Sequence, residues 1–416
     1  MMRTDHLSAG YGTEDIIRGI CLDAAEGEFI GIIGPNGSGK TTLIKAMSRV
    51  LATRKGAVTI EGRLLDDYDP KELARTLGVV PQETSVGFSY TVGDIVMMGR
   101  FPHHTRFTRE SPEDYRVVEE AMAVTGIGHL AARPVTEISG GERQRVIIAR
   151  TLAQQPRFLL LDEATAHLDI NHQVEILSII RGLGSGVTKI GVFHDLNLAS
   201  AYCDRILLMA GGEVRAMGTP EEVLTRENLR EHYGIDALIQ THPVTGRPIV
   251  LPLEGTAHRS SSSTGSPPAP STRVHLVCGG GSGSGLMYRL TAAGCEVTAG
   301  ILCDGDSDTC TAAALGIEFL CIPPFSPIGP EETAALKEMV AAADVAILTA
   351  MPIGPGNLAN LEVLCDQETT PVIIYMPEGG QFTDYTGGKL DAVLKCIEEK
   401  GAGRISRVED LLSSLK

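Results

Sequence analysis

Short apolar runs alternate with segments of helical spacing along most of the chain. In the first half, three runs lack the polar alternation of a half-exposed strand, and such runs are typical of buried parallel strands. They are Phe29–Ile33, Arg157–Leu161 and Lys189–Phe193. A Gly-rich turn follows the first run, and Thr41–Leu51 then has the spacing of a helix.

Cap and turn residues predict further elements in this half. Ser111 to Asp114 (SPED) has an N-cap serine, a proline at the first helical position and acids in the first turn, so a helix begins there. Arg205–Ala216, with two glycines at its centre, is predicted to be a hairpin. Thr219 to Glu222 (TPEE) opens another helix.

After residue 272 the alternation of strand and helix becomes regular. The predicted strands are Val274–Cys278, Glu296–Cys303, Glu318–Ile322, Asp344–Leu348 and Val372–Met376. Helical segments stand between them, among them Leu286–Ala293 and Glu331–Ala342. This order predicts a doubly wound parallel sheet of the Rossmann-like kind.

The segment between the two halves has a different composition. Thr256–Thr272 contains 6 Ser, 3 Pro and 3 Thr in 17 residues, which leaves almost nothing to bury. A flexible tether of this length spans about 23 Å. Because single cores rarely exceed about 250–300 residues, we expect the 416 residues to form a domain at 1–255, a linker at 256–272 and a domain at 273–416.

Composition and charge narrow the function. The formal net charge is −16, and residues 271–416, with 19 acids against 9 bases, carry −10 of it. Nucleic-acid binding needs basic surface, so we expect no nucleic-acid partner. No apolar stretch is long enough to span a membrane, so other chains are expected to do any spanning. Nine cysteines without a C-x-x-C pair favour free thiols in a reducing cytosol over disulfides or zinc.

A phosphate-binding loop follows the first apolar run. The segment matches G-x-x-x-x-G-K-[ST], a pattern in which backbone N–H groups surround phosphate at a helix N-terminus. Lys40 would reach the β- and γ-phosphates, and the Thr41 hydroxyl would hold Mg²⁺. The predicted ATP-binding residues here are Gly34, Pro35, Asn36, Gly37, Ser38, Gly39, Lys40, Thr41 and Thr42.

Two acids end the second apolar run. Asp162 suits a Mg²⁺ ligand, and Glu163 suits polarising the attacking water. Between these acids and the loop lies Ile138 to Gln144 (ISGGERQ). It resembles the signature of the ATP-binding-cassette ATPases, and the resemblance covers about residues 3 to 253. It implies a P-loop NTPase cassette with a RecA-like core, a helical subdomain and a β-subdomain.

The resemblance assigns roles to further residues. Ser139, Gly140 and Gly141 would contact the γ-phosphate held by a second copy, so that two cassettes form a homodimer. By the same resemblance, Tyr11 would stack on adenine, and Gln82 would touch Mg²⁺ and water. His194 would bond the γ-phosphate, and the loop of Asp169 would cross the dimer interface. Glu163, His194 and Gln82 are thus the catalytic candidates, and Thr41, Gln82 and Asp162 the Mg²⁺ candidates.

The resemblance also selects a class within the cassettes. Ser89–His103, Thr165–Gln173 (TAHLDINHQ) and Asn228–Leu253 resemble the iron-siderophore, haem and vitamin B12 importers. This implies a membrane permease and an extracytoplasmic binding protein as partners, with the ATPase at the cytoplasmic face of the membrane. The alternative is a soluble cassette ATPase for cofactor assembly or signalling, with the second domain as a sensor.

Two local patterns in the first half leave alternatives open. Val92–Arg100 reads as a short amphipathic helix whose Met97 and Met98 suit either a permease contact or the core of the helical subdomain. His103 and His104 lack a third metal ligand at suitable spacing, so we expect them to be solvated loop residues.

The appended half resembles extensions of archaeal cobalamin-import ATPases, which favours cobalamin as cargo. Its Gly279–Gly285 turn fits a dinucleotide fingerprint only with Ser284 in place of the third glycine, and Asp304 stands where a ribose-binding acid is expected. Nucleotide binding, corrinoid binding and a plain tight turn in a docking domain all remain open. Seven cysteines lie in this half, and those on strands are expected to be small buried apolar residues.

Overall fold

The computed structural model describes residues 1–82, 90–105, 109–165, 168–253, 272–324, 326–367 and 369–415. The chain forms two compact units, Met1–Leu251 and Pro252–Lys416, and each is described by itself. Most of the predicted linker, Ser89 of the importer-like stretch, and Ala166 and His167 of the Asp169 loop lie outside the described residues. Within the described residues, no helix is both long and apolar enough to cross a membrane.

The first unit contains two main sheets. A four-stranded antiparallel sheet has the order β2-β1-β4-β5, and a six-stranded sheet has the order β10-β9-β3-β8-β7-β6. The second sheet is parallel except for β10, which pairs with β9 as the predicted hairpin. Its strands are β3 (Phe29–Ile33), β6 (Leu77–Val80), β7 (Phe158–Leu161), β8 (Thr188–Val192), β9 (Arg205–Ala210) and β10 (Glu213–Gly218). The other strands of this unit are β1 (Met2–Ala9), β2 (Ile17–Ala24), β4 (Lys55–Ile60), β5 (Arg63–Leu64), β11 (Ala237–Thr241) and β12 (Pro248–Pro252).

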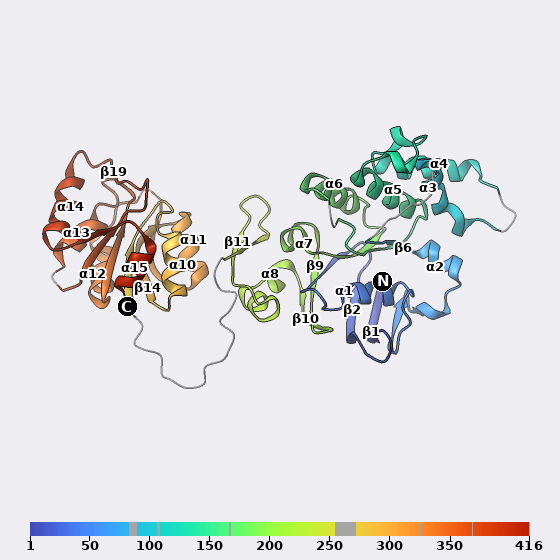
Figure 1. The fold of residues 1–416 in the computed structure, drawn as a ribbon, viewed down its shortest axis with the longest axis horizontal. Helices are drawn as coiled ribbons and strands as arrows, with labels where there is room; N and C mark the ends of the chain where they lie inside the picture. The colour runs from blue at the N-terminus through green and yellow to red at the C-terminus, as the bar shows by residue number, and fades with distance from the viewer. Residues whose placement is uncertain are drawn as a thin grey trace. The chain divides into compact units, whose positions relative to one another are not determined.

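Helices cover the six-stranded sheet and build a separate layer. Figure 1 shows α3, α4 and α5 gathered at the end of this unit opposite β1 and β2. Their apolar faces share one core, with Val92, Ile95, Val118, Met122 and Val146 buried in it. The longer helices are α1 (Lys40–Met47), α2 (Pro70–Thr76), α3 (Val92–Met97), α4 (Pro112–Val124), α5 (Gly140–Ala153), α6 (Ile170–Arg181) and α7 (Leu196–Tyr202). Shorter ones are α8 (Pro220–Val223), α9 (Arg226–Asn228), η1 (Leu65–Asp67), η2 (Met98–His103), η3 (Gly128–Leu130), η4 (Val135–Glu137) and η5 (Leu229–Tyr233).

The helix starts follow the predicted caps. Ser111 caps α4 in a capping box with Asp114, and Pro112 occupies the first helical position. The helix after the Gly-rich turn is shorter than predicted. It ends at Met47 rather than Leu51 because the backbone of Arg49, at φ 61°, leaves the helical region.

The second unit is a doubly wound parallel sheet, as predicted. Its strands β13 (Arg273–Val277), β14 (Glu296–Cys303), β15 (Glu318–Ile322), β16 (Val345–Thr349), β18 (Val372–Tyr375) and β20 (Gly403–Ile405) have the order β15-β14-β13-β16-β18-β20. The connections reverse direction between β13 and β16, which is the switch point of this topology. β17 (Pro352–Ile353) and β19 (Thr383–Asp384) form a small separate ladder.

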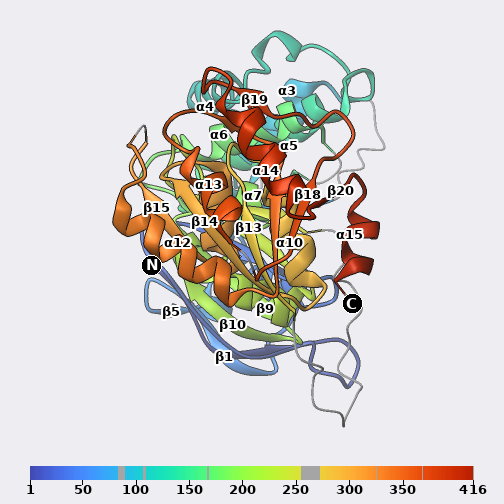
Figure 2. The ribbon, with the colours of Figure 1, turned by 90° about the vertical axis from the view of Figure 1, so that its left-hand side faces the viewer.

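Helices cover both faces of this sheet. Figures 1 and 2 show α12 and α13 on one side and α10 on the other. Alternate residues of β13 pack into the two cores on either side of the sheet. Val277 packs with α12, α13 and α14, whereas Leu276 packs with α10, α11 and α15. The helices are α10 (Ser284–Ala292), α11 (Ser307–Leu315), α12 (Pro330–Ala342), α13 (Ala359–Asp366), α14 (Lys389–Glu399) and α15 (Val408–Ser414).

Candidate functional site

The phosphate-loop residues lie between β3 and α1, at the carboxyl end of a central parallel strand. A Cβ at Gly34 would lie 2.2 Å from the carbonyl oxygen of Met209, so only glycine fits there. Gly39 has φ 96° and directly precedes α1, so the chain turns sharply into the helix. The N-terminus of α1 therefore lies at this end of the sheet, and its backbone N–H groups attract anions.

Lys40 is buried beneath its own loop. Its ammonium donates to the carbonyl oxygens of Gly34 at 2.7 Å and Pro35 at 3.1 Å. Burial lowers the pKa of Lys40, and the nearby Glu163 carboxylate partly opposes that effect. Ser38 Oγ is buried, and no residue of the described chain hydrogen bonds to it. A cation and an unsatisfied hydroxyl at a helix N-terminus suit a polyphosphate.

The magnesium candidates meet on neighbouring elements. Thr41 Oγ1, in the first turn of α1, donates to Asp162 Oδ1 at 3.1 Å, immediately after β7. Burial raises the pKa of Asp162, the Thr41 hydrogen bond lowers it, and the Glu163 charge raises it. Hydroxyl and carboxylate oxygens are the ligands that Mg²⁺ prefers, so these two residues fit the ion.

The three catalytic candidates form one cluster. Glu163 Oε1 lies 2.7 Å from His194 Nε2, and Glu163 Oε2 accepts a hydrogen bond from Gln82 Nε2. Glu163 has φ 52°, a left-handed conformation that is costly for a residue with a Cβ and is typical of functional sites. The structure thus brings together the ends of β6, β7 and β8, whose carboxyl ends point the same way.

The signature residues occupy the start of α5. Ser139 is the N-cap, and its hydroxyl accepts from the backbone N–H of Glu142 at 3.2 Å and donates to that carboxylate at 2.8 Å. The backbone N–H and the hydroxyl of Ser139 both donate to the Glu142 carboxylate, and these two bonds lower the pKa of Glu142. Ser139 and Gly140 are exposed and Gly141 is buried. The exposed Ser139 and Gly140 at this helix N-terminus are therefore accessible to an anion from another molecule.

The other predicted positions lie at the rim. Tyr11 is 51% exposed in the turn between β1 and β2, and Ile17, a few residues later, lies directly against Gly39. Asp169 caps α6, accepting from the backbone N–H of His172 at 3.0 Å. Asn36 and Gly37 are exposed at the tip of the phosphate loop, while Thr42 is buried within α1.

Two contacting residues were missed from the sequence. The hydroxyl of Tyr233, in η5, is hydrogen bonded to the backbone of Gly34, and burial raises the pKa of that hydroxyl. His172 packs against Gly141. Neither has a local pattern that marks it, because both contacts join segments far apart in the chain.

The two histidines before the α4 cap are not solvated, contrary to expectation. His103 Nε2 lies 3.0 Å from the Gln154 carbonyl, and His104 Nε2 lies 3.0 Å from Asp114 Oδ2. Both are half-buried because Arg100, itself buried, also pairs with Asp114 and draws η2 against α4. For the two methionines, the structure supports a core role, since both are partly buried against the core of α3, α4 and α5.

In the second unit, side chains of the same unit already occupy the N–H groups of the Gly-rich turn. Asp306 accepts from Gly280 N at 2.7 Å, and the fully buried Asp308 accepts from Gly283 N at 3.1 Å and Ser284 Oγ at 2.6 Å. These carboxylates, two and four residues after Asp304, stand where a phosphate would be cradled. The turn therefore supplies its own anion, which favours the tight-turn interpretation.

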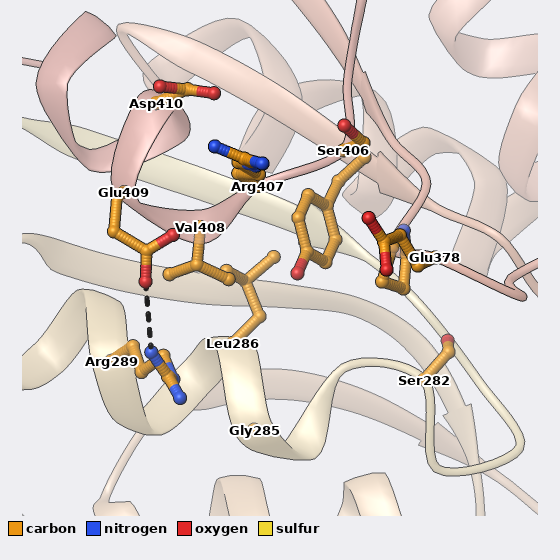
Figure 3. Close-up of a pocket in the computed structure, with 12 residues that line it drawn as sticks. Ser282, Gly285, Leu286, Arg289, Glu378, Ser406, Arg407, Val408, Glu409 and Asp410 are labelled. Carbon is orange, nitrogen blue, oxygen red and sulfur yellow. Dashed lines mark ion pairs between the residues drawn. The ribbon is translucent and has the colours of Figure 1, made fainter.

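A cavity of about 740 Å³ lies beside this turn. Figure 3 shows it between α10 and the segment that starts α15, with the Arg289–Glu409 ion pair of 3.9 Å at its edge. Its charged lining consists of Arg289, Arg407, Glu378, Glu409 and Asp410. The mixed charges do not select a single ligand class.

The cysteine expectation was wrong in part. Cys365 in α13 and Cys396 in α14 form a disulfide, with their Cα atoms 6.0 Å apart. Cys278 is buried as expected, but Cys303 and Cys321, on strands β14 and β15, are exposed. β15 is the edge strand and Cys303 ends β14, so neither position is covered on both faces.

Comparison with known proteins agrees with this geometry. Residues 17–166 match the family model described as ABC transporter, and residues 297–412 match the MJ0874 family. The chain is 40% identical over 335 residues to the cobalamin import ATP-binding protein BtuD of Halobacterium salinarum, covering 80% of this chain and 81% of the relative. It is 39% identical to the ferric enterobactin transport ATP-binding protein FepC of Escherichia coli, covering 63% and 97%.

A solved structure is similar as well. A metal-chelate type ABC transporter in an inward-facing conformation matches with a TM-score of 0.54 and 28% identity, over 61% of this chain and 96% of that one. The site geometry, the family model and the long alignment with BtuD lead to one conclusion. The chain belongs to the ATP-binding proteins of ABC transporters and is an ATPase that hydrolyses ATP for transport.

Proposed function

We propose that this protein powers the import of a metal chelate, with cobalamin as the cargo, through a separate membrane permease served by an extracytoplasmic binding protein. It lies at the cytoplasmic face of the membrane and works as a homodimer of cassettes. The observation that carries the ATP-hydrolysing part of the proposal is the cluster of Gln82, Glu163 and His194 beside Lys40 and the Thr41–Asp162 pair.

The cluster suits hydrolysis of a terminal phosphoryl group. The Glu163 carboxylate orients a water molecule and takes its proton as the new oxygen–phosphorus bond forms and the bond to the leaving ADP breaks. His194 and Gln82 hold the two oxygens of Glu163 in place. Lys40 stabilises negative charge on the phosphates. Mg²⁺, held by Thr41, Asp162 and Gln82, would supply further charge neutralisation.

The exposed signature residues are the basis for the proposed homodimer. Ser139 and Gly140 lie exposed at the start of α5, and Asp169 lies exposed at the start of α6. In a head-to-tail pair, Ser139 and Gly140 would face the phosphate loop of the second copy and Asp169 would lie at the interface between the copies, so that two ATP molecules are enclosed. Closure of the pair would drive the permease, and hydrolysis would reset it.

The choice of cobalamin rests on the extent of the similarity. The alignment with the Halobacterium BtuD spans 335 residues and therefore reaches into the second unit, which begins at Pro252. The alignments with FepC and with the hemin import ATP-binding protein HmuV of Pseudomonas putida cover only 63% and 60% of this chain. The second unit thus sets this chain apart from the siderophore and haem relatives and links it to the cobalamin one.

The catalytic assignment is tested by Glu163→Gln. We expect the variant to bind ATP normally and to form ATP-dependent dimers while turnover falls by about 1,000-fold, because the amide cannot take the proton. Lys40→Ala should instead weaken ATP binding itself, and Lys55→Ala, at an exposed position on strand β4, serves as the control. Normal turnover in Glu163→Gln would remove Glu163 from its role.

The import assignment is tested by co-purification and transport. We expect the tagged protein to be recovered with a multi-helix membrane protein, and proteoliposomes containing both to take up cobalamin in preference to a ferric siderophore or haem. Recovery with soluble partners only would support the alternative of a non-transport cassette ATPase.

A further inference from the structure

Two helices of the first unit begin side by side at residues that the proposed dimer would use. α5 starts at the signature serine, Ser139, and α6 starts at Asp169. We propose that His172 is a positioning residue that locks these two helix starts together, so that the signature and Asp169 move as one body. The inference rests on the proposed function, because it concerns how one copy presents both segments to the other.

The imidazole of His172 is wedged between the two segments. Its Nδ1 lies 2.8 Å from Asp169 Oδ1, the distance of a hydrogen bond in which the ring N–H donates to the carboxylate. The opposite edge of the ring faces Gly141. A Cβ at residue 141 would lie 2.6 Å from Cδ2 and 3.0 Å from Nε2 of the ring. The ring therefore fills the space that any side chain at 141 would need.

The hydrogen bonds to Asp169 hold the His172 ring in one orientation. The carboxylate accepts from both the backbone N–H and the ring of His172, and these two bonds lower the pKa of Asp169. The carboxylate consequently stays ionised at neutral pH, where a charged acceptor makes the stronger hydrogen bond. The Asp169 carboxylate, which caps α6, thus also holds the ring of His172 in place.

Further contacts extend the seam along both helices. One turn beyond Gly141, Arg145 pairs with Glu175 of α6 at 2.8 Å. On the other side of the first turn of α6, Gln173 Nε2 donates to the carbonyl of Thr165 at 3.1 Å. The first turn of α6 therefore holds the chain that leads away from Glu163 and also the start of the signature helix.

The consequence concerns the coupling between the two nucleotide sites of the dimer. Ser139 and Gly141 would serve one site, while Asp169 would cross toward the other. A rigid link between them lets closure at one site position the other. Because His172 acts through Gly141 and Asp169, its loss should affect dimer closure and the maximal rate, and leave nucleotide binding to the monomer unchanged.

The experiment compares variants in the Glu163→Gln background, where the ATP-bound dimer accumulates. We expect His172→Ala to weaken ATP-dependent dimerisation by about tenfold, measured by sedimentation, because it removes a charge-assisted hydrogen bond and the ring packing. The dissociation constant of a fluorescent ATP analogue for the monomer should change less than twofold. His172→Asn, whose amide can still donate to Asp169, should restore part of the dimerisation. His129→Ala, at an exposed position, is the matched control.

A double-mutant cycle tests the packing directly. Gly141→Ala should block dimerisation through the clash with the ring, and adding His172→Ala should relieve part of that block. In the otherwise unmodified enzyme, His172→Ala should lower kcat more than it changes KM.

The outcomes separate the two proposals. Dimerisation of Glu163→Gln/His172→Ala equal to that of Glu163→Gln would overturn the role of His172, as would strictly additive effects in the cycle. If Glu163→Gln itself stays monomeric with ATP, the two-cassette arrangement fails, whatever His172 does.

Discussion

At the scale of single residues, the buried Asp162 lowers the stability of the fold while suiting the proposed chemistry. The Asp162 carboxyl is 7% exposed, and burial raises its pKa. A carboxyl whose pKa is higher in the folded state binds its proton more tightly there than in the unfolded chain. The ionised form therefore costs stability at every pH above the folded-state pKa. The buried, ionised carboxylate of Asp162 thus lowers the free energy of unfolding, and its negative charge suits a cation.

Asp162→Asn is expected to raise the free energy of unfolding of the first unit at pH 8 while lowering Mg²⁺-dependent turnover by at least about 100-fold. The amide oxygen can still accept from Thr41 but brings no charge. The stability gain should shrink as the pH falls through the folded-state pKa, because the native carboxyl is then neutral too. Urea unfolding over a series of pH values from 8 downward measures the first effect, and phosphate release measures the second. A variant less stable than the parent at pH 8 would contradict the argument.

His275 provides a pH-dependent element in the second unit. The side chain is fully buried on β13, with Nδ1 2.8 Å from Thr298 Oγ1, and burial lowers its pKa to about 4. The folded state therefore holds the neutral ring, and the stability that this gives is present above pH 6.5 and is lost as the pH falls toward 4. We expect the second unit to lose about 3 kcal/mol between pH 7 and pH 4 from this group.

The measurement uses the full chain. Pulse proteolysis across a urea series, with the fragments identified by mass, follows the second unit alone. His275 is the one histidine between residues 272 and 415 of the sequence, so His275→Val should flatten the profile between pH 6.5 and pH 4. An unchanged slope in that variant would show that other groups dominate.

The residues of the site differ in how far the sequence could predict them. Lys40, Thr41 and the acids after β7 stand in contiguous patterns whose chemistry is local, and the structure brings them together. Tyr233 contacts Gly34, and His172 contacts Gly141. Those contacts exist only once distant segments have packed, so no local pattern marks them.

Among the elements, buried parallel strands were the easiest to predict. β3 and β14 have the bounds expected from the sequence, because strands covered on both faces are apolar over most of their length. Helix ends were harder, since the end of α1 depends on the positive φ of Arg49 and not on apolar spacing. Exposure at the sheet edge was missed for Cys321, because strand order is a tertiary property.

The disulfide between α13 and α14 gives a prediction at this scale. Cys365 and Cys396 are separated by 31 residues, and closing a loop of that length stabilises the fold by about 2–4 kcal/mol through the unfolded chain. We expect Cys396→Ser to lower the unfolding free energy of the second unit by this amount in oxidising buffer. With dithiothreitol present, parent and variant should unfold at the same urea concentration. A difference that persists in reductant would instead reflect lost packing.

At the scale of the whole molecule, the two units differ in charge, and each has its own core. Residues 271–416 carry −10 of the net −16, which leaves −6 on residues 1–270. Every buried apolar cluster draws its residues from one unit only: three lie before residue 251 and two after residue 273, within the described chain. Each unit therefore buries its own apolar surface, as an independently stable domain does.

This independence predicts the result of removing the second unit. All the site residues lie between Tyr11 and Tyr233, and FepC matches this chain over 97% of its own length while covering only 63% of this one. Residues 1–253 should therefore fold and hydrolyse ATP with kcat within about threefold of the full chain, and their thermal midpoint should lie close to that of the first unit in the full chain. Phosphate release and calorimetry provide the measurements. The shortened chain with Glu163→Gln is the control for contaminating ATPase. Insoluble protein, or a loss of turnover greater than tenfold, would mean that the second unit supports the catalytic one in spite of their separate cores.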